Sequence, residues 1–264
     1  RFGPHSSDRT IVDLAESLEL VHTASLVHDD IVDRADVRRN VPTVNAVWND
    51  DVALIVGDYL FAKAYALAAV LPKPEVIAIV AQTVFALCDG ELTEVTSPPA
   101  IPSEKQYLDR IELKTASLYA ACCQGAALLA DADPEHVAAL GAYGTNVGLS
   151  FQITDDVLDL VGSEALGKEV GRDLAEGMPT LPMIYAVEYS EGDELASRIL
   201  APDKDPRERR DLIARIRASG GVERAHGRAR LFHDQAVAAL DRLPERPERD
   251  ALREVADFIL RRER

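Results

Sequence analysis

LVHDDIVDR, residues 26–34, carries three aspartates in the order Asp-Asp-x-x-Asp. If the stretch is helical, Asp29 and Asp33 project from the same face, with about 5–6 Å between their Cβ atoms. Two such carboxylates repel each other unless a cation lies between them. Mg²⁺ suits this position because it takes oxygen ligands, often one or two carboxylates together with the phosphates of a substrate. The stretch therefore indicates either a divalent-cation site or a solvated acidic face.

A second copy of the pattern favours the cation site. DDVLD, residues 155–159, repeats the spacing of the acids inside an otherwise different sequence. An apolar run also leads into the first copy, which a fully solvated face would not need. We call residues 29, 30 and 33 the first triad and residues 155, 156 and 159 the second triad. We expect the two triads to form two arms of one site.

Composition places the chain among globular proteins and limits its partners. Of 264 residues, 47% are hydrophobic, 28% are charged and only 5% are aromatic. Alanine and leucine are abundant, which favours helices. The formal net charge is -16, and such a surface repels nucleic acid and anionic lipid. A phosphate-bearing ligand must therefore be held by a local basic cluster or through metal ions.

Three observations bear on where the protein works. The chain has three cysteines, Cys88, Cys122 and Cys123, without the spacing of zinc ligands, so we expect reduced thiols in the cytoplasm. No apolar run reaches the ~20 residues that cross a bilayer, and no signal peptide is recognisable, so we expect no transmembrane segment. Because the sequence opens at Arg1 within a loop-like stretch, we expect that a preceding segment is missing.

Apolar periodicity predicts helices throughout the chain. Apolar positions between Ile11 and Val21 recur at steps of three and four, which predicts a helix with the first triad at its C-terminal end. Asp133 as cap and Pro134 in the first turn begin the helix that carries the second triad. No stretch alternates as a strand requires, so we predict an all-α chain of about nine or ten helices without a linker between domains. The other helices are expected within 52–71, 76–95, 103–130, 181–189, 212–218, 222–243 and 249–260.

Basic residues accompany the acids. Arg38-Arg39 follows the first triad, Lys114-Thr115 lies between the triads, and Gly167-Lys168 follows the second. Carboxylates alone would repel a diphosphate, whereas Mg²⁺ between them would hold it and neutralise the charge that it gains on leaving. Arginine adds bidentate contacts and lysine adds a point charge. The implied chemistry is ionisation of a carbon–oxygen bond to a carbocation, which an apolar cavity shields from water.

An ordered set of short motifs surrounds these residues. It comprises HDDIVD (28–33) with RR (38–39), GDYL (57–60), LKTA (113–116), GLSFQITDDVLD (148–159), GK (167–168), GRDL (171–174), EG (176–177) and TLP (180–182). With them the chain resembles the trans-isoprenyl diphosphate synthases, or polyprenyl synthases, over most of its length. The resemblance implies a homodimer and a single-domain helical bundle of isoprenoid synthase type around a central cavity, spanning residues 1–264. It also implies head-to-tail (1′-4, trans) condensation of isopentenyl diphosphate onto an allylic diphosphate.

The resemblance assigns roles to individual residues. Mg²⁺, three ions per site with diphosphate bound, would be held by Asp29, Asp33 and Asp155, with Asp30, Asp156 and Asp159 bound directly or through water. Arg38, Lys114 and Lys168 would contact the allylic diphosphate, and Arg39 would contact that of isopentenyl diphosphate. The catalytic residues would be Lys114, Thr115 and Gln152, the last two near the reacting carbons, where they stabilise the cation or steer proton loss. The released diphosphate is the expected base.

The chain departs from the resemblance in three places. The family's Gly-Gly-Lys-Arg-x-Arg-Pro segment is missing before Arg1, so we expect an incomplete isopentenyl diphosphate site in this sequence. Asn40 stands where glycine usually follows the two arginines, and asparagine tolerates the positive φ of a tight turn. Met178 stands where a lysine often follows Glu-Gly. That change removes one cationic contact, a pattern that we associate with longer-chain members.

Product length should depend on the helix face below the first triad. Ala24 and Ser25 lie five and four residues before Asp29 and should point into the cavity, where similar short-chain enzymes place a bulky aromatic floor. Both residues are small, so we predict a medium- or long-chain product. The alternative is that an aromatic residue on another helix closes the tunnel lower down: Phe61, Tyr65 or Phe85.

Two other functions stay open at this point. A class I terpene cyclase shares the metal-triggered ionisation, although cyclases generally replace the second triad by an Asn/Ser/Glu type of motif. A non-catalytic partner subunit of a prenyl synthase would not need two intact triads. Among lesser signals, Glu91 and Glu94 are predicted to be polar neighbours of the dimer or the cavity. Arg261–Arg264 is predicted to be a solvated tail, with a basic terminus that folds over the diphosphate as the alternative.

Overall fold

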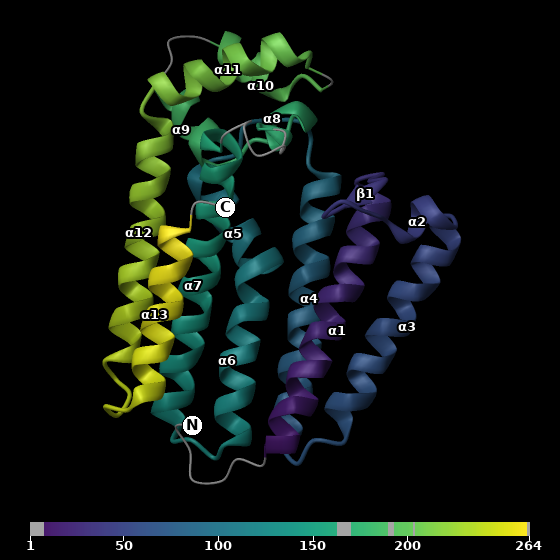
Figure 1. Cartoon of the computed structure of the whole chain (residues 1–264), viewed down its shortest axis with the longest axis vertical. Coiled ribbons are helices and arrows are strands. Elements are labelled where there is room, and N and C mark those ends of the chain that lie inside the picture. The colour runs from purple at the N-terminus through teal and green to yellow at the C-terminus, as the bar shows by residue number, and fades with distance from the viewer. Residues whose placement is uncertain (1–7, 163–169, 190–192, 203, 263–264) are drawn as a thin grey trace. The chain divides into compact units, whose positions relative to one another are not determined.

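The computed structural model describes residues 8–162, 170–189, 193–202 and 204–262. These residues are almost entirely α-helical (Figure 1), so the predicted all-α class is confirmed. The exception is a two-stranded antiparallel hairpin, in which Val37 pairs with Pro42 and Arg38 with Val41. The hairpin and the short helices α2, α8 and α10 were not expected, because elements of this length show no hydrophobic period.

Short connections join the elements. The helix expected over 103–130 is divided by a π-helical turn, η1, and α7 is 28 residues long. In chain order the bounds are α1 (Asp8–Val32), β1 (Val37–Arg38), β2 (Val41–Pro42), α2 (Val44–Val47), α3 (Asp50–Ala69), α4 (Pro74–Thr96), α5 (Glu104–Ile111), η1 (Glu112–Ala116), α6 (Ser117–Leu129), α7 (Pro134–Val161), α8 (Arg172–Glu176), α9 (Leu181–Glu188), α10 (Glu194–Leu200), α11 (Pro206–Ala218), α12 (Gly221–Leu240) and α13 (Pro247–Arg261).

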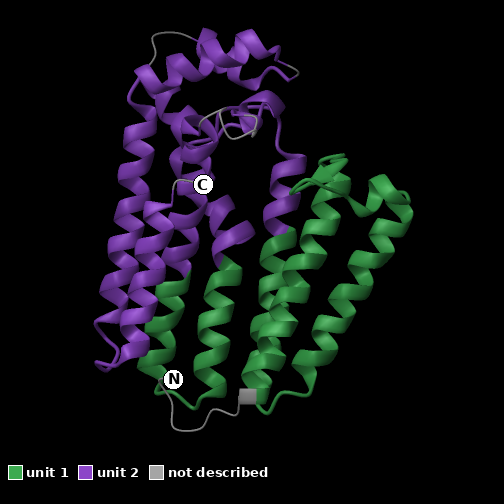
Figure 2. Ribbon diagram, in the orientation of Figure 1, with its two compact units in different colours: residues 1–88, 117–144 green, residues 89–116, 145–264 purple. Residues whose placement is uncertain are grey.

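The chain divides into two compact units, each built from two separate segments (Figure 2). Unit 1 comprises residues 1–88 and 117–144, and unit 2 comprises residues 89–116 and 145–264. The first triad therefore belongs to unit 1 and the second triad to unit 2. That residues 1–264 act as one isoprenoid synthase domain stays a prediction.

Unit 1 packs around α1. Leu14, Leu18 and Val21 of α1 form one buried cluster with alanines of α3 and apolar residues of α4 and α6. Small residues allow α1 and α3 to approach closely. A Cβ atom at Gly57 of α3 would lie 2.1 Å from Nε2 of His28 on α1, so any larger residue there would displace the His28 ring. This packing fixes the helix that ends in the first triad.

Unit 2 has its own core around α7. Leu149, Ile153 and Leu160 of α7 are buried together with α9, whose residues 181–186 are all buried. Leu212 and Ile216 of α11 belong to the same cluster. At the N-terminus of α5, Ser103 and Gln106 form a capping box, which satisfies two backbone donors of the first turn. The core fixes α7, which carries the second triad.

Two helices, α3 and α4, are long and apolar enough to cross a membrane by length and composition alone. The expectation of no such segment missed them, because it looked for an uninterrupted apolar run. Helices of this kind are weak evidence of a membrane span, since core helices pass the same test. Only 22% of the apolar window of each helix is buried, and Leu54, Ile55 and Tyr59 of α3 are exposed. The chain by itself thus leaves much of this apolar surface uncovered.

Candidate functional site

The first triad lies at the C-terminal end of α1 in unit 1. Its middle acid, Asp30, is buried and accepts a hydrogen bond from Nε of Arg38 at 2.7 Å. Asp29 is half-buried and Asp33 is exposed. The middle acid is therefore held by a basic residue of the same unit, and the two outer acids are less buried than it is.

The hairpin that follows α1 places the two predicted basic residues. Its turn consists of Arg39 and Asn40, with φ angles of 52° and 63°. Positive φ at both central positions is what a type I′ turn requires. The prediction that Asn40 permits this turn is confirmed, and Arg39 adopts the same backbone region at a steric cost. Arg38 reaches back to Asp30, while Arg39 is exposed.

The predicted chain-length residues differ in their surroundings. Ala24 is fully buried, and Ser25 is half-buried, with its hydroxyl donating to a backbone carbonyl of the preceding turn at 2.9 Å. Of the alternative floors, Phe61 and Tyr65 pack against the unit 1 core. Phe85 is 70% exposed, so it closes no cavity within the described part of unit 1.

In unit 2, a chain of hydrogen bonds runs from the π-helical turn to the second triad. The Thr115 hydroxyl donates to Oε1 of Gln152 at 2.9 Å, and Nε2 of Gln152 donates to Asp156 at 2.8 Å. The Tyr107 hydroxyl donates to the other oxygen of Asp156. Burial raises the pKa of Asp156 to about 6, against the effect of these two donors. Both residues predicted to lie near the reacting carbons are therefore linked to the middle acid of the triad.

Asp159, the last acid of the second triad, caps α8. Its two oxygens accept hydrogen bonds from the backbone N–H groups of Arg172 at 3.0 Å and Asp173 at 3.3 Å. The cap residue of α8 itself, Gly171, has a φ of 76° and no side chain for this task. Burial raises the pKa of Asp159, while these N–H groups oppose the rise. Asp159 thereby holds Asp173 beside the triad.

Asp173 is an acidic residue to which the sequence motifs assigned no role. Burial, followed by the charges of Asp156 and Asp159, raises its pKa well above the usual value. It lies in the GRDL motif, which was recognised only as part of the resemblance. Clustered carboxylates with raised pKa values are what a cation would stabilise.

Asp155, the first acid of the second triad, is bound by Arg262, the C-cap residue of α13. Nη2 of Arg262 lies 3.0 Å from Oδ1 of Asp155 and 3.0 Å from the carbonyl oxygen of Phe151. Its guanidinium also stacks 3.9 Å from the centre of the Phe151 ring. The side chain of Arg262 is only 12% exposed. The prediction of a solvated tail is therefore wrong for this residue.

Lys114 lies in the π-helical turn η1, an element that is rare and often found at functional sites. Its Nζ atom is 2.6 Å from Glu91 and 2.7 Å from Glu94, both on α4. Burial opposes the charged form of Lys114, but the two carboxylates outweigh it and raise the pKa. The lysine is therefore positively charged and fixed in position. The two glutamates, predicted only as polar neighbours, are its partners.

A pocket of about 160 Å³ in unit 2 brings these groups together. The three predicted catalytic residues, Lys114, Thr115 and Gln152, line it. Arg110 of α5, which the sequence analysis missed, and Met178 belong to the same lining. The spacing of Arg110, four residues before Lys114, is the signal that could have found it. The remaining lining residues are Glu94, Tyr107, Ile111, Asp156, Asp173 and Thr180.

The donor chemistry of the triads suits Mg²⁺, because all six side chains offer carboxylate oxygens. Within the described ranges, no three His, Cys, Asp or Glu side chains gather closely enough to hold a metal ion. Mg²⁺ usually keeps several waters and shares the phosphates of its substrate, so these residues fit an ion whose coordination a diphosphate completes. Lys168 belongs to residues 163–169, which lie outside the described residues.

Comparisons with known proteins agree on one family. The model of the family described as "Polyprenyl synthetase" matches residues 2–216. The chain is 40% identical to heptaprenyl diphosphate synthase component 2 of Geobacillus stearothermophilus, over 100% of this chain and 82% of that protein. The solved decaprenyl diphosphate synthase of Rhodobacter capsulatus superposes with a TM-score of 0.89 at 33% identity, covering 97% of this chain and 82% of that one. A polyprenyl synthase from Caulobacter crescentus, solved with calcium and isoprenyl diphosphate, gives 0.87 at 33% identity, over 96% and 78%.

Proposed function

Because the chain belongs to the polyprenyl synthetase family, we infer that it is a trans-prenyltransferase with the all-α isoprenoid synthase fold. It condenses isopentenyl diphosphate head to tail with an allylic diphosphate and makes a medium- or long-chain polyprenyl diphosphate. The observation that carries the mechanism is the hydrogen-bonded chain from Thr115 through Gln152 to Asp156. It places neutral oxygen atoms beside an acid triad.

We propose that the accessible acids Asp29, Asp33 and Asp155 bind the metal, with three ions per site once diphosphate is present. When bound, Mg²⁺ neutralises the charge that develops on the leaving diphosphate. Calcium in the Caulobacter crescentus relative is a hard cation with the same preference for oxygen, which supports this proposal. The other acids are less accessible, because Asp30 and Asp156 are buried and both oxygens of Asp159 accept backbone hydrogen bonds. We assign them to positioning, with any metal contact made through water.

The basic residues are proposed to bind the two diphosphates. Lys114 is suited to the allylic diphosphate, because Glu91 and Glu94 keep it charged and in place. Arg38 and Lys168 are assigned to the same group by resemblance alone. Arg39, exposed on the hairpin turn, is assigned to isopentenyl diphosphate.

Thr115 and Gln152 are proposed to face the carbocation. A hydroxyl carries one donor and two lone pairs. The Thr115 hydroxyl donates its hydrogen bond to Gln152, so the lone pairs of its oxygen stay available to a developing positive charge. Gln152 is orientated by the same bond and by Asp156, which fixes the direction of its amide dipole. Pre-orientated dipoles of this kind stabilise charge without reorganisation during the reaction.

Product length is proposed to follow from the small, buried Ala24 and its neighbour Ser25. A small residue leaves room for a growing chain, whereas an aromatic one would stop it. The heptaprenyl and decaprenyl synthases among the relatives support a medium- or long-chain product. Phe61 or Tyr65 is the alternative gauge if the chain stops at the unit 1 core.

We propose that two copies of the chain associate. The apolar faces of α3 and α4 carry the exposed residues Leu54, Ile55, Tyr59 and Phe85, and most of each helix stays uncovered within one chain. Surfaces of this kind usually meet a partner. A homodimer would cover them. Light scattering of the purified chain tests this, and a monomer at micromolar concentration contradicts it.

We also propose that the enzyme works in the cytoplasm, which the free thiols Cys88, Cys122 and Cys123 support. Burial raises the pKa of Cys123 to about 12, so that thiol is an unreactive apolar group. The terpene cyclase and the non-catalytic subunit are less favoured, because both aspartate triads are complete and the named relatives are synthases.

Product analysis tests the proposed function. The protein, with any residues that precede Arg1, is incubated with Mg²⁺, isopentenyl diphosphate and allylic primers of increasing length, and the products are separated by chain length. Linear polyprenyl diphosphates of seven or more isoprene units are expected. Cyclised hydrocarbons would favour the cyclase, and a folded protein without turnover would favour the non-catalytic subunit.

A further inference from the structure

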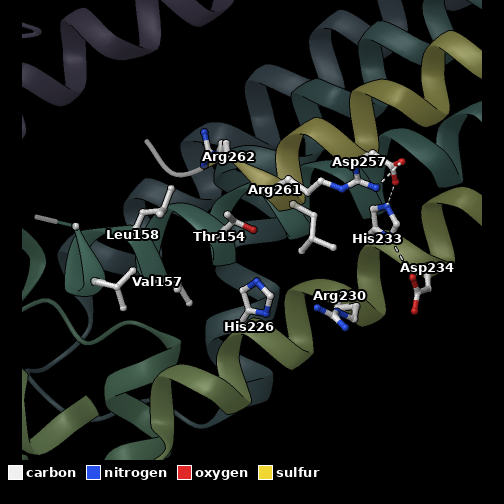
Figure 3. A pocket seen from close by; sticks show the side chains of 13 residues that line it. Thr154, Val157, Leu158, His226, Arg230, His233, Asp234, Asp257, Arg261 and Arg262 are labelled. Carbon is white, nitrogen blue, oxygen red and sulfur yellow. Dashed lines mark hydrogen bonds and ion pairs between the residues drawn. The ribbon is translucent and has the colours of Figure 1, made fainter.

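A second, larger pocket lies in unit 2 between α7, α12 and α13 (Figure 3). Its volume is about 820 Å³, within the range of about 300–1,000 Å³ that small-molecule sites occupy. Lys114, Thr115 and Gln152, which are proposed for the reaction, do not line it. The proposed reaction therefore gives this pocket no function.

The lining of the pocket contains more arginines than aspartates, although the protein as a whole is acidic. Three arginines and two aspartates line it, although the whole chain carries a formal charge of -16. Both aspartates are engaged by His233, whose Nδ1 lies 3.0 Å from Asp234 and whose Nε2 lies 2.8 Å from Asp257. Two of the arginines are also paired, Arg261 with Asp257 and Arg262 with Asp155. Arg230 is the remaining positive charge of the lining, and it favours an anion.

Two of the cationic or basic side chains in the pocket have no partner in the part of the chain that the structure describes. They are His226 and Arg230, four residues apart on α12. This spacing puts them on one face of the helix. Figure 3 shows both side chains together on one side of the pocket, with Thr154 of α7 across from them.

Thr154 gives an independent sign of a missing ligand. Its side chain is only 2% exposed, and its hydroxyl oxygen has no hydrogen-bond partner among the described residues. A buried hydroxyl without a partner destabilises the folded protein, because it loses its hydrogen bonds to water. Nearly all buried polar groups in proteins are satisfied, so an unsatisfied hydroxyl that lines a pocket points to a bound group that accepts or donates a hydrogen bond.

The chemistry of the lining specifies the ligand. An arginine fork, an imidazole N–H and a hydroxyl together provide the donors that a phosphate group accepts. The pocket is far larger than a phosphate ion, and α7 and α13 supply an apolar wall that includes Val157, Leu158 and Leu260. A ligand that uses both features has an anionic head and an apolar body.

We propose that this pocket binds an organic phosphate, separately from the reacting diphosphates. Arg230, His226 and Thr154 hold the phosphate head, and the apolar body packs against Val157 and Leu158. The proposal does not depend on the reaction assigned above, because it rests on the lining of a pocket that the reaction does not use.

Calorimetric titration of the full chain with hexyl phosphate tests the proposal. The titration is made in EDTA, because the reaction site proposed above requires Mg²⁺ to hold a phosphate. Arg230→Ala and Thr154→Val are each expected to weaken binding by about tenfold or more, which corresponds to about 1.4 kcal/mol. Arg207→Ala is the matched control, since it removes the same charge from an exposed position on α11 that does not line the pocket.

Thr154→Val also separates binding from folding. Valine keeps the shape of threonine and removes only the unsatisfied hydroxyl, so the melting temperature should stay the same or rise while binding is lost. Inorganic phosphate, which lacks the apolar body, should bind more weakly than hexyl phosphate. The proposal is overturned if hexyl phosphate does not bind in EDTA, or if Arg230→Ala and Thr154→Val bind it as tightly as Arg207→Ala does.

Discussion

Arg262 and Asp155 are joined by a hydrogen bond of 3.0 Å between Nη2 and Oδ1. The same guanidinium stacks on Phe151, one helical turn before Asp155 on α7. A cation of the protein therefore lies at the carboxylate that we propose as a Mg²⁺ ligand. A metal bound by Asp155 would compete with the arginine for one oxygen atom, which would couple the C-terminal end of α13 to metal binding.

Arg262→Ala should lower the Mg²⁺ concentration needed for half-maximal turnover. Asp155 is 58% exposed, and an ion pair of this exposure is worth up to about 1 kcal/mol, or about fivefold. The measurement is the Mg²⁺ dependence of turnover. Arg261→Ala is the control, because Arg261 pairs with Asp257 and not with the triad. A higher Mg²⁺ requirement in Arg262→Ala would show that the arginine assists the metal.

Asp156→Asn should stabilise the metal-free protein at pH 7. Folding raises the pKa of this carboxyl from 3.8 to about 6, so between these values the folded state binds more protons than the unfolded state. Stability therefore falls as the pH rises through this window, by about 1–3 kcal/mol in all. Asparagine carries no charge, and Gln152 can turn its amide to match it.

The corresponding measurement is thermal denaturation in EDTA from pH 4 to pH 7. The advantage of Asp156→Asn should be absent at the acid end and complete at pH 7. An advantage that is equal at both ends would contradict a buried carboxylate at this position.

Lys114→Met should reduce turnover by about a hundredfold or more, because it removes a fixed charge at the developing diphosphate. It should also destabilise the protein by about 1–2 kcal/mol, since Glu91 and Glu94 are left without their cation. Denaturant unfolding measures the second effect. The double variant Lys114→Met/Glu94→Gln should recover part of the stability but none of the turnover. Equal stability of the single and double variants would rule out this ion pair as the cause.

Ala24→Tyr should shorten the product. The site is fully buried, so an aromatic ring there either fills the growing chain's space or overpacks the helix, at a cost of about 1–3 kcal/mol. The products are separated by chain length, and thermal denaturation checks the fold. Val12→Tyr serves as control, because Val12 is an exposed position on the same helix. If the folded Ala24→Tyr variant made a product of unchanged length, a residue other than Ala24 would limit the product length.

Sequence reasoning succeeded where the signal is local. Steps of three and four predicted α1, and a capping aspartate followed by a first-turn proline predicted the start of α7. The helices that carry the two acid triads were therefore expected from the sequence. The positive φ of Asn40 also followed from residue type. These features depend on interactions between neighbours in the chain, which periodicity and propensity describe.

The remaining features depend on tertiary contacts. The π-helical turn at Lys114 interrupts what reads as one continuous helix, because propensity does not distinguish the two. Arg262 contacts Asp155, which lies 107 residues away in the sequence, and no local pattern predicts such a pair. The sequence also did not show that the middle acid of each triad differs from the outer ones. Asp30 is bound by Arg38 and Asp156 by Tyr107, and these contacts form only in the folded units.

The central proposal is that acids of both triads are required for Mg²⁺-dependent binding of diphosphate, and calorimetric titration with inorganic diphosphate in Mg²⁺ tests it most directly. The wild type should bind in Mg²⁺ and not in EDTA. Asp29→Ala and Asp155→Ala should each weaken binding by about a hundredfold while remaining folded, and Asp36→Ala, an exposed acid outside the triads, should bind normally. Wild-type affinity in either Asp29→Ala or Asp155→Ala would contradict the claim.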